Sequence, residues 1–260
     1  MNAVFSTWGM KHFGQMYAKL LGWQYCEDMP VGDVDTVYII GMYDSPDYDW
    51  TLENTKRAKR RVIHWCGSDA MALTRPEMLP EAIHLADSTM VQDQLRKHGI
   101  DAALVPAPTV LHPEVTPLPE TPTVSVYFGS VPENYGASYV RYLMDCLPDV
   151  RWATYQFGQY DEEQMHELFK QTTVALRLTS HDGSAAGTRE FLEAGRYVVT
   201  FRDIPHAKRV SPEDPVGLLR AVRAALGKKE PNKEAAEFYA WHNSAERFLQ
   251  QFESSTKGVE

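Results

Sequence analysis

Residues 180–200 read SHDGSAAGTREFLEAGRYVVT, and this stretch decides both the fold and the kind of site that we expect. Small residues at 183–187 predict a loop, and the apolar run at 197–200 predicts a strand after a short helix. Small residues let backbone N–H groups approach an anion, and the start of a helix adds a partial positive charge. Asp182 and Glu190 flank the centre of this stretch with carboxylates, which accept hydrogen bonds from hydroxyl groups. The pattern suits a ligand with a phosphate centre and sugars at both ends, which describes a nucleotide-sugar.

The composition is that of an ordinary soluble globular protein, with 260 residues, 43% of them apolar and 23% charged. This length allows one large α/β domain or two small ones. Cys26, Cys66 and Cys146 are far apart and without metal-ligand spacing, so we expect reduced thiols and a cytoplasmic protein. The sequence shows neither a signal-peptide pattern nor an apolar run of the roughly 20 residues that span a bilayer. The net charge of −9 provides no overall attraction to nucleic acid or anionic lipid.

Short β-branched or aromatic runs alternate with amphipathic stretches along most of the chain, which predicts parallel sheets covered by helices. The strands that we expect lie at 4–6, 36–42, 61–65, 83–86, 102–105, 123–128, 151–155, 174–178 and 197–201. The helices that we expect lie near 10–21, 51–60, 88–98, 135–147, 161–171, 188–195 and 214–226. A long helical pattern at 233–253 ends the chain.

Six prolines within the seventeen residues 106–122 predict an extended connection between two domains, because proline is poorly tolerated inside helices and central strands. We therefore expect an N-terminal Rossmann-like domain at 1–112, a Pro-rich linker at 113–122, a C-terminal Rossmann-like domain at 123–231, and a C-terminal helix and tail at 232–260.

The stretch Asp182-x7-Glu190, followed by Gly195 and Val198-Val199, resembles the Glu-x7-Glu signature of retaining GT-B glycosyltransferases, in particular the GT4-like group. Asp stands in place of the first Glu, and the chain is short for that family. Three further segments resemble the family in the same order along the chain, namely VIHWCGSD at 62–69, the stretch 86–106, and FYAWHNSA at 238–245.

The resemblance implies an α/β fold of two Rossmann-like domains facing a cleft, with the C-terminal helix packing back on the first domain. It implies that 1–112 receives an acceptor and that 123–231 binds a nucleotide-sugar. The expected activity is a hexosyl- or pentosyltransferase that moves the sugar to a hydroxyl acceptor, with retention of configuration. No cofactor and no metal are expected, because the nucleotide-sugar is a co-substrate.

The donor-binding residues that we expect lie in the loops after strands and at the helix start: Gly9, Gly129, Ser130, Gly183, Ser184, Gly187, Thr188, Arg189 and Glu190. Glu190 would accept hydrogen bonds from ribose hydroxyls; otherwise it is a glutamate near a helix start, stabilised by the helix dipole. Asp182 would hold hydroxyls of the transferred sugar; otherwise it caps a turn. Gly9 would admit the donor phosphate close to the backbone, or is an ordinary turn glycine.

Many family members carry an Arg and a Lys after the first strand of the nucleotide domain, whereas 129–136 here reads GSVPENYG without a base. Arg177 is our first candidate for the cation that replaces them, and Arg189 is the second. Arg177 interrupts an apolar strand, and a buried unpaired charge is costly. It therefore faces the phosphate or pairs with Asp182.

His64 and Asp69 flank a turn at the carboxyl end of a strand, where α/β sheets bind ligands. Asp69 would orient an acceptor hydroxyl or cap the helix that follows. His64 would take part in the chemistry or lie in the core as a satisfied histidine.

The one basic run, KRAKRR at 56–61, is a solvated helix end or a surface that steers a polyanionic acceptor. We reject the two Asp-x-Asp pairs, Asp33/Asp35 and Asp47/Asp49, as metal ligands because they lie away from the signature.

The acceptor stays open among a glycan, a lipid, a small molecule and modified DNA. Two alternative functions remain, a DNA-modifying glycosyltransferase that acts on a hydroxylated base and a non-catalytic nucleotide-sugar-binding protein.

Overall fold

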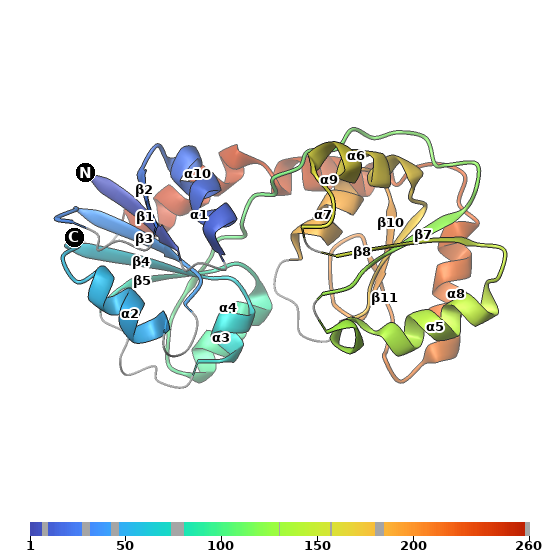
Figure 1. The fold of residues 1–260 in the computed structure, drawn as a ribbon, viewed down its shortest axis with the longest axis horizontal. Coiled ribbons are helices and arrows are strands. Elements are labelled where there is room, and N and C mark those ends of the chain that lie inside the picture. The colour runs from blue at the N-terminus through green and yellow to red at the C-terminus, as the bar shows by residue number, and fades with distance from the viewer. Residues whose placement is uncertain are drawn as a thin grey trace. The chain divides into compact units, whose positions relative to one another are not determined.

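The computed structural model describes residues 1–6, 10–27, 32–42, 47–73, 81–129, 131–156, 158–179 and 185–257, and omits the side chains of Glu27, Asp47, Tyr48 and Ser68. The chain divides into two compact units, shown in Figure 1. Unit 1 comprises Met1–Pro108 and Ala245–Glu260, and unit 2 comprises Thr109–Ser244.

Unit 1 contains a six-stranded parallel sheet of order β2-β1-β3-β4-β5-β6. Its strands are β1 (Asn2–Ser6), β2 (Gln24–Glu27), β3 (Thr36–Ile40), β4 (Arg60–Trp65), β5 (Ile83–Ala86) and β6 (Ala103–Leu104). The central strands are almost continuously apolar because helices cover both faces of the sheet. β2 is missing from the sequence prediction, since this short edge strand contains polar Gln24 and Glu27.

The helices of unit 1 lie in two layers. They are α1 (Lys11–Leu21), α2 (Asp47–Asn54), α3 (Ser68–Met71), α4 (Thr89–Lys97) and α10 (Ala245–Thr256). Residues of α1 and α10 pack on one face of the sheet, and residues of α2, α3 and α4 pack on the other.

Helix α10 completes the core of unit 1, although it lies at the far end of the chain. Phe248 is 1% exposed and its ring centroid lies 5.0 Å from that of Tyr17. Phe252 lies 5.6 Å from the ring of Tyr38. The C-terminal helix thus packs on the first domain, as the resemblance implied. The single helical pattern predicted at 233–253 is instead two helices, and α9 (Lys233–His242) belongs to unit 2.

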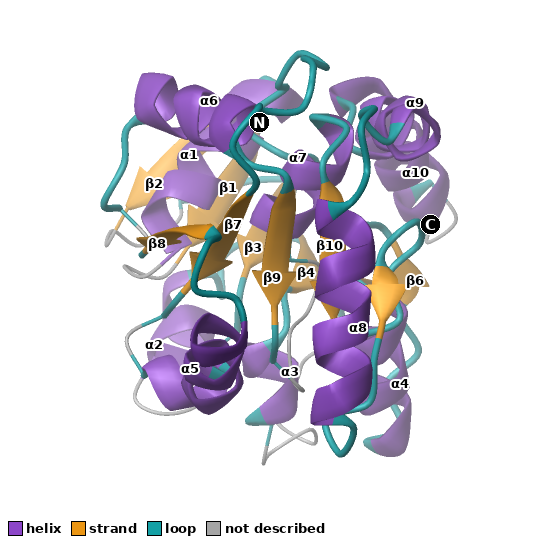
Figure 2. Ribbon diagram, turned by 90° about the vertical axis from the view of Figure 1, so that its right-hand side faces the viewer, coloured by secondary structure: helices purple, strands orange, loops and turns teal. Residues whose placement is uncertain are grey.

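Unit 2 contains a five-stranded parallel sheet of order β11-β10-β9-β7-β8, part of which is visible side by side in Figure 2. Its strands are β7 (Thr123–Tyr127), β8 (Arg151–Tyr155), β9 (Val174–Arg177), β10 (Tyr197–Thr200) and β11 (Lys208–Arg209). The two-residue edge strand β11 is also missing from the prediction, because its sequence is charged and exposed. All nine predicted strands are present.

Helices α5 (Ala137–Cys146) and α8 (Pro215–Leu226) contribute to one core of unit 2, and α6 (Glu162–Gln171), α7 (Ala186–Glu193) and α9 contribute to the other. Local sequence explains where these helices begin. Asp161 and Gln164 form a capping box before α6, and the Asp214 side chain accepts from Gly217 N before α8. All seven predicted helices are present, although α2 ends at Asn54, so that residues 55–59 of the predicted helix 51–60 are not helical and Arg60 begins β4. Among the helices of the described ranges, none has the length and apolar character that a bilayer crossing requires.

The Pro-rich stretch is free of helix and strand from Val105 to Pro122. The fully buried Arg196 holds part of it, since Nη1 donates to Pro117 O at 3.2 Å and Nη2 donates to Thr116 Oγ1. Burial lowers the pKa of Arg196 to about 10, which leaves the guanidinium charged at neutral pH.

We expect Phe248→Ala to lower the free energy of unfolding of unit 1 by about 3–5 kcal/mol, because it removes a buried ring and leaves a cavity. Urea denaturation followed by circular dichroism measures the change. Gln250→Ala, on the exposed part of the same helix, is the matched control and should change it by less than about 0.5 kcal/mol. Equal effects of the two substitutions would contradict the packing of α10 in unit 1.

Candidate functional site

In the parallel sheet of unit 2, β7 pairs with β8 on one side and with β9 on the other. The chain runs from β7 to β8 and then returns to β9, so the strand order reverses between β7 and β9. Open α/β sheets bind ligands outside the carboxyl ends of their strands at such a point. The candidate site is therefore the edge where β7, β8 and β9 end.

Arg177 is the last residue of β9 and lies at this edge. Its guanidinium carbon is 4.4 Å from the ring centroid of Tyr127 and 4.8 Å from that of Tyr135. Both distances are within the range of a cation–π interaction. The structure thus brings the first candidate cation to the point where the strand order reverses.

Gly129 follows β7 and has no room for a side chain. A Cβ there would lie 2.5 Å from Tyr135 Cζ and 2.7 Å from Tyr135 Oη. The tyrosine therefore occupies the space that the missing side chain provides. Gly129 was predicted as a donor contact, and in the structure it makes room for one of the rings beside Arg177.

Tyr155, the last residue of β8, connects the parts of this edge. Its ring lies 5.4 Å from Tyr127, and a Cβ at Gly187 in α7 would lie 3.6 Å from its hydroxyl. Burial raises the pKa of Tyr155, with the Arg177 charge opposing and the Glu190 charge adding to that shift. Tyr155 thus lies between Tyr127, whose ring Arg177 contacts, and Gly187 at the start of α7.

A polar hollow of about 340 Å³ lies at the ends of β7 and β8. Its lining consists of Phe128, Thr154, Tyr155, Gln156 and Gln159. The side chains are uncharged and combine two aromatic rings with two amides and two hydroxyl groups. This lining suits a flat, neutral group that carries hydrogen-bonding edges.

Helix α7 begins at Ala186, two residues earlier than predicted. The Thr188 amide donates to Ala185 O at 3.0 Å and the Arg189 amide to the same oxygen at 3.2 Å. The backbone amide of Thr188 is therefore engaged within the helix start, and a donor role for its hydroxyl, the other group considered, stays a prediction. Gly187 lies one residue closer to the helix end, where amides lack intrahelical partners.

Glu190 is the fifth residue of α7 and is only 6% exposed, so it is not a first-turn glutamate. Its Oε1 accepts from the Leu111 amide at 3.3 Å. Burial raises the pKa of Glu190 to about 7, although the Leu111 hydrogen bond and the charge of Arg189 act in the opposite direction. A buried carboxyl with this pKa is a common feature of functional sites.

Arg189, the second candidate cation, lies on the side of α7 that contacts α9. Its Nη1 donates to Asn243 Oδ1 at 3.3 Å, and its side chain is 8% exposed. Asn243 Nδ2 also donates to Glu193 Oε2 at 2.5 Å, and Glu193 Oε1 lies 3.0 Å from His112 Nδ1. We therefore revise the prediction for Arg189, because its contacts hold α7, α9 and the extended segment together.

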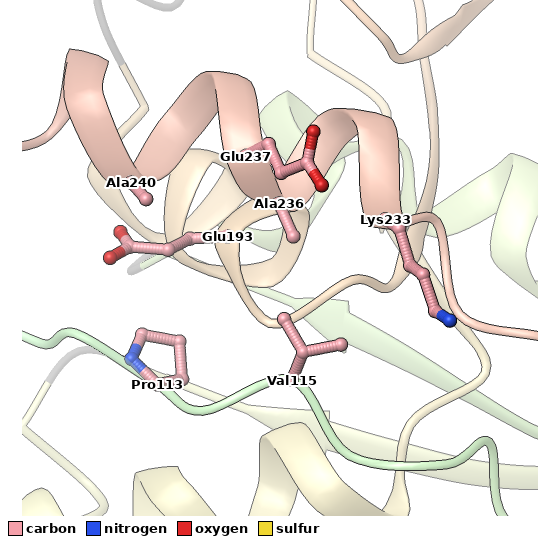
Figure 3. Close-up of a pocket in the computed structure, with 7 residues that line it drawn as sticks. All are labelled: Pro113, Val115, Glu193, Lys233, Ala236, Glu237 and Ala240. Carbon is pink, nitrogen blue, oxygen red and sulfur yellow. The ribbon is translucent and has the colours of Figure 1, made fainter.

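A second hollow lies elsewhere in unit 2, at the C-terminal end of α7 (Figure 3). It has a volume of about 480 Å³ and is lined by Pro113, Val115, Glu193, Lys233, Ala236, Glu237 and Ala240. None of the predicted site residues lines it, so we do not assign the site to this hollow.

Five predicted site residues lie outside the described residues. They are Gly9, Ser130, Asp182, Gly183 and Ser184. Their predicted roles stay predictions.

His64 is fully buried in the core of unit 1. Its Nδ1 hydrogen-bonds to Tyr38 Oη, and its ring stacks on Phe248 at an interplanar angle of 9°. Burial lowers the pKa of His64 to about 3, which keeps the ring neutral. The core role, one of the two roles considered for this residue, fits these surroundings; a catalytic role does not.

Asp69 is also fully buried, and it serves the backbone around it. Its carboxylate accepts from the amides of Met42 (3.1 Å), Cys66 (3.0 Å), Gly67 (2.8 Å) and Ala70 (2.9 Å). The residue therefore ties the loop after β3 to the turn after β4. These contacts favour the capping role over the orientation of an acceptor hydroxyl.

The basic run pairs with the first Asp-x-Asp motif. Arg57 Nε donates to Asp33 Oδ1 at 2.9 Å, and Lys59 Nζ donates to Asp35 Oδ1 at 2.7 Å. Lys56 pairs with Glu53. These carboxylates partly neutralise the positive surface that a polyanionic acceptor would need.

Sequence reasoning missed Tyr127, Tyr135 and Tyr155. The available signal was the pair of tyrosines that end two strands, since Tyr127 and Tyr155 lie opposite each other in register. Aromatic residues at strand ends are common, however, and only the order of the strands shows that these two lie at the reversal point.

Neither a family model nor a curated protein matches this sequence. The structure resembles the apo lipopolysaccharide outer core galactosyltransferase WaaB with a TM-score of 0.67 and 13% identity, covering 98% of this chain and 99% of that one. It resembles a mutant of TarM in complex with fondaparinux, alpha-GlcNAc-glycerol and UDP with a TM-score of 0.61 and 10% identity, covering 92% of this chain. This chain spans 57% of the length of TarM.

A third resemblance is to sucrose-phosphate synthase from Thermosynechococcus elongatus, with a TM-score of 0.60 and 15% identity, covering 94% of this chain and 73% of that one. These structures have the GT-B glycosyltransferase fold. At identities this low the likeness shows the fold, and it confirms the fold that the sequence resemblance implied.

We expect Asp69→Asn to lower the free energy of unfolding by about 1–3 kcal/mol, because an amide cannot accept from the same set of buried N–H groups. Urea denaturation measures it, with Asp93→Asn at an exposed ion pair as the control. An unchanged stability combined with lost activity would restore the catalytic role.

The raised pKa of Glu190 predicts a pH-dependent stability. The folded protein holds this proton up to a pH of about 7, whereas the carboxyl has an ordinary pKa of 4.5. The stabilisation is therefore complete below about pH 4.5 and is lost as the pH rises through 7. A pKa shift of this size corresponds to about 3 kcal/mol in the free energy of unfolding.

Glu190→Gln should remove this dependence, so that the variant gains stability relative to the wild type at pH 8 but not at pH 4. Urea denaturation across this pH range measures the difference. Glu237→Gln, at an exposed position of α9, is the control. Parallel profiles for the wild type and Glu190→Gln would contradict the prediction.

Proposed function

We propose that this protein is a glycosyltransferase that moves a hexosyl or pentosyl group from a nucleotide-sugar to a hydroxyl acceptor. The GT-B fold supports this class, since the three structures compared above include a galactosyltransferase and a protein bound to UDP. The single observation that carries the proposal is the edge of unit 2, where Arg177 and the start of α7 at Gly187 lie beside the tyrosines that end β7 and β8, at the reversal of strand order.

Each part of that edge matches one part of a nucleotide-sugar. The guanidinium of Arg177 and the first amides of α7 would neutralise the phosphates, which become leaving-group charge when the anomeric C–O bond breaks. The neutral hollow beside Phe128 would take the base. Glu190 would accept from the ribose hydroxyls, and Asp182 would hold the transferred sugar.

For the ribose to reach Glu190, its hydroxyls would replace or share the hydrogen bond that the Leu111 amide now donates. A carboxylate accepts several hydrogen bonds, so both partners are compatible with its two oxygens. The extended segment is therefore a direct neighbour of the proposed ribose site.

Retention of configuration and independence from metal follow from the resemblance to the GT4-like group, and we include both in the proposal. Independence from metal is supported by Asp33 and Asp35, whose carboxylates pair with Arg57 and Lys59. Full activity in EDTA, together with an α-linked product from an α-linked donor, would be the expected results. We place the protein in the cytoplasm, which its three free cysteines support.

The acceptor class stays open among a glycan, a lipid and a small molecule. The ion pairs of the basic run disfavour DNA, because their carboxylates oppose the field that phosphates need. A non-catalytic nucleotide-sugar-binding protein differs from the proposal in one measurable respect, which is turnover.

A thermal-shift screen of UDP, GDP and ADP with their common sugars should identify a nucleotide-sugar that stabilises the protein. At about one hundred times its dissociation constant, the ligand adds about 2.7 kcal/mol. Glu190→Ala should lose most of that stabilisation because its ribose contacts are gone. Slow hydrolysis of the sugar, followed by chromatography in the same samples, identifies an enzyme.

Glu237→Ala is the matched control for this experiment, since it removes an exposed carboxylate outside the site. Stabilisation without hydrolysis or transfer would favour the binding protein. No stabilisation by any of the nucleotides would refute the proposal.

A further inference from the structure

We propose that Tyr127 and Tyr135 are positioning residues that hold the Arg177 guanidinium for the phosphates of the donor, so that this site selects nucleoside diphosphates by their charge. The inference rests on the proposed function and deepens it. It assigns a task to two tyrosines that neither the sequence motif nor the fold identifies.

The two tyrosine rings form a corner beside the guanidinium of Arg177. Their ring centroids are 5.2 Å apart and their planes meet at 78°. The guanidinium carbon lies in this corner, 4.4 Å from one centroid and 4.8 Å from the other. Three distances of similar length therefore place the cation against both rings at once.

Tyr135 is held in this corner by two glycines. Gly129 leaves the space that its ring fills. Gly136 follows the short 3₁₀ helix Pro132–Tyr135 with a φ of 76°, and a Cβ there would lie 2.6 Å from Leu178 Cβ and 2.7 Å from Leu178 O. The turn that carries Tyr135 is thus seated against the residue that follows Arg177.

Tyr127 is held by the sheet itself. It is the last residue of β7, and its partner in the ladder is Tyr155 on β8. The two rings meet at 67° with centroids 5.4 Å apart. Strand pairing on one side and glycine-enforced packing on the other therefore fix both walls of the corner before any ligand binds.

This arrangement has a consequence for binding. An arginine side chain loses considerable rotamer entropy when it is ordered, and a side chain held in advance does not lose it on binding. The attraction to both rings acts on the charge of the guanidinium, and its N–H groups bind phosphate oxygens in pairs. Arg177 can therefore bind a diphosphate while its charge stays beside both rings.

The competing interpretation is that the cation–π contacts only stabilise the end of β9. The two interpretations predict different effects of a substitution on the affinity for ligands with no, one or two phosphates. A structural contact changes the affinity for nucleoside, monophosphate and diphosphate alike, whereas a positioned cation changes the increment that each phosphate adds.

The experiment is isothermal titration calorimetry with uridine, UMP and UDP, with the corresponding guanosine and adenosine series, and with inorganic pyrophosphate. For the series that binds the wild type, Arg177→Gln should lower the diphosphate affinity about 10- to 100-fold. The same substitution should change the nucleoside affinity less than about twofold. Pyrophosphate binding should weaken with the diphosphate.

The tyrosine variants test positioning itself. Tyr135→Leu should lower the diphosphate affinity about 3- to 10-fold because it removes one wall of the corner. Tyr135→Phe keeps the ring and should match the wild type. Gly129→Ala should behave like Tyr135→Leu, since the added Cβ displaces the ring.

Arg141→Gln is the matched charge control, because Arg141 is exposed on α5 and is the first base after β7. It should leave every affinity within about twofold. Arg177→Lys is the second variant, and it should retain the salt dependence of diphosphate binding while losing affinity, because lysine keeps the charge without the planar fork. Thermal melts of each variant establish that it is folded.

Three results would overturn the inference. If Arg177→Gln gains as much affinity from nucleoside to diphosphate as the wild type does, Arg177 does not bind the phosphates, and the proposed function still stands. Equal affinities for Tyr135→Leu and Tyr135→Phe remove the positioning role. A wild-type protein that binds no nucleotide of any series refutes the proposed function itself, and the inference with it.

Discussion

The parallel pairing of β7 with β9 is the contact on which the candidate site depends. Its register places Val124 beside Val174 and Val126 beside Leu176. Each strand continues one residue further, so Tyr127 and Arg177 end neighbouring strands at the same edge. Two residues fifty positions apart in the sequence, Tyr127 and Arg177, are thus brought into contact. The buried apolar side chains of both strands specify this register, because a slip by one residue would turn every side chain to the opposite face.

Helix α7 shows how the same unit accommodates charge in its interior. Six consecutive residues from Thr188 to Glu193 are buried, and three of them are ionisable. Such groups are costly to bury unless they are paired or hydrogen-bonded. Arg189 and Glu193 hydrogen-bond to Asn243, the residue that follows α9, Glu193 also pairs with His112, and Glu190 accepts from the Leu111 amide. The helix is therefore anchored by the extended segment on one side and by α9 on the other.

Much of the fold could be predicted because the periodicity of this sequence is strong. Each predicted strand and helix exists, and the elements that were missed are short: the edge strands β2 and β11 and the single turn α3. Their sequences carry polar or charged residues, and they form because a neighbouring strand or loop provides their partners. The end of α9 and the start of α10 on either side of Asn243–Ser244 were also not predicted, since the helical pattern of the sequence continues across these residues.

The candidate residues divide in the same way. The sequence alone identified a two-domain α/β protein, the position of the helix that carries Glu190, and Arg177 as a cation out of place in an apolar strand. These features follow from local chemistry, which neighbouring residues determine. Only the tertiary structure decided that His64 and Asp69 serve the core, that Arg189 contacts α9, and that two tyrosines hold Arg177. Burial and hydrogen-bond partners depend on which strands lie side by side, and residues distant in the sequence settle that order.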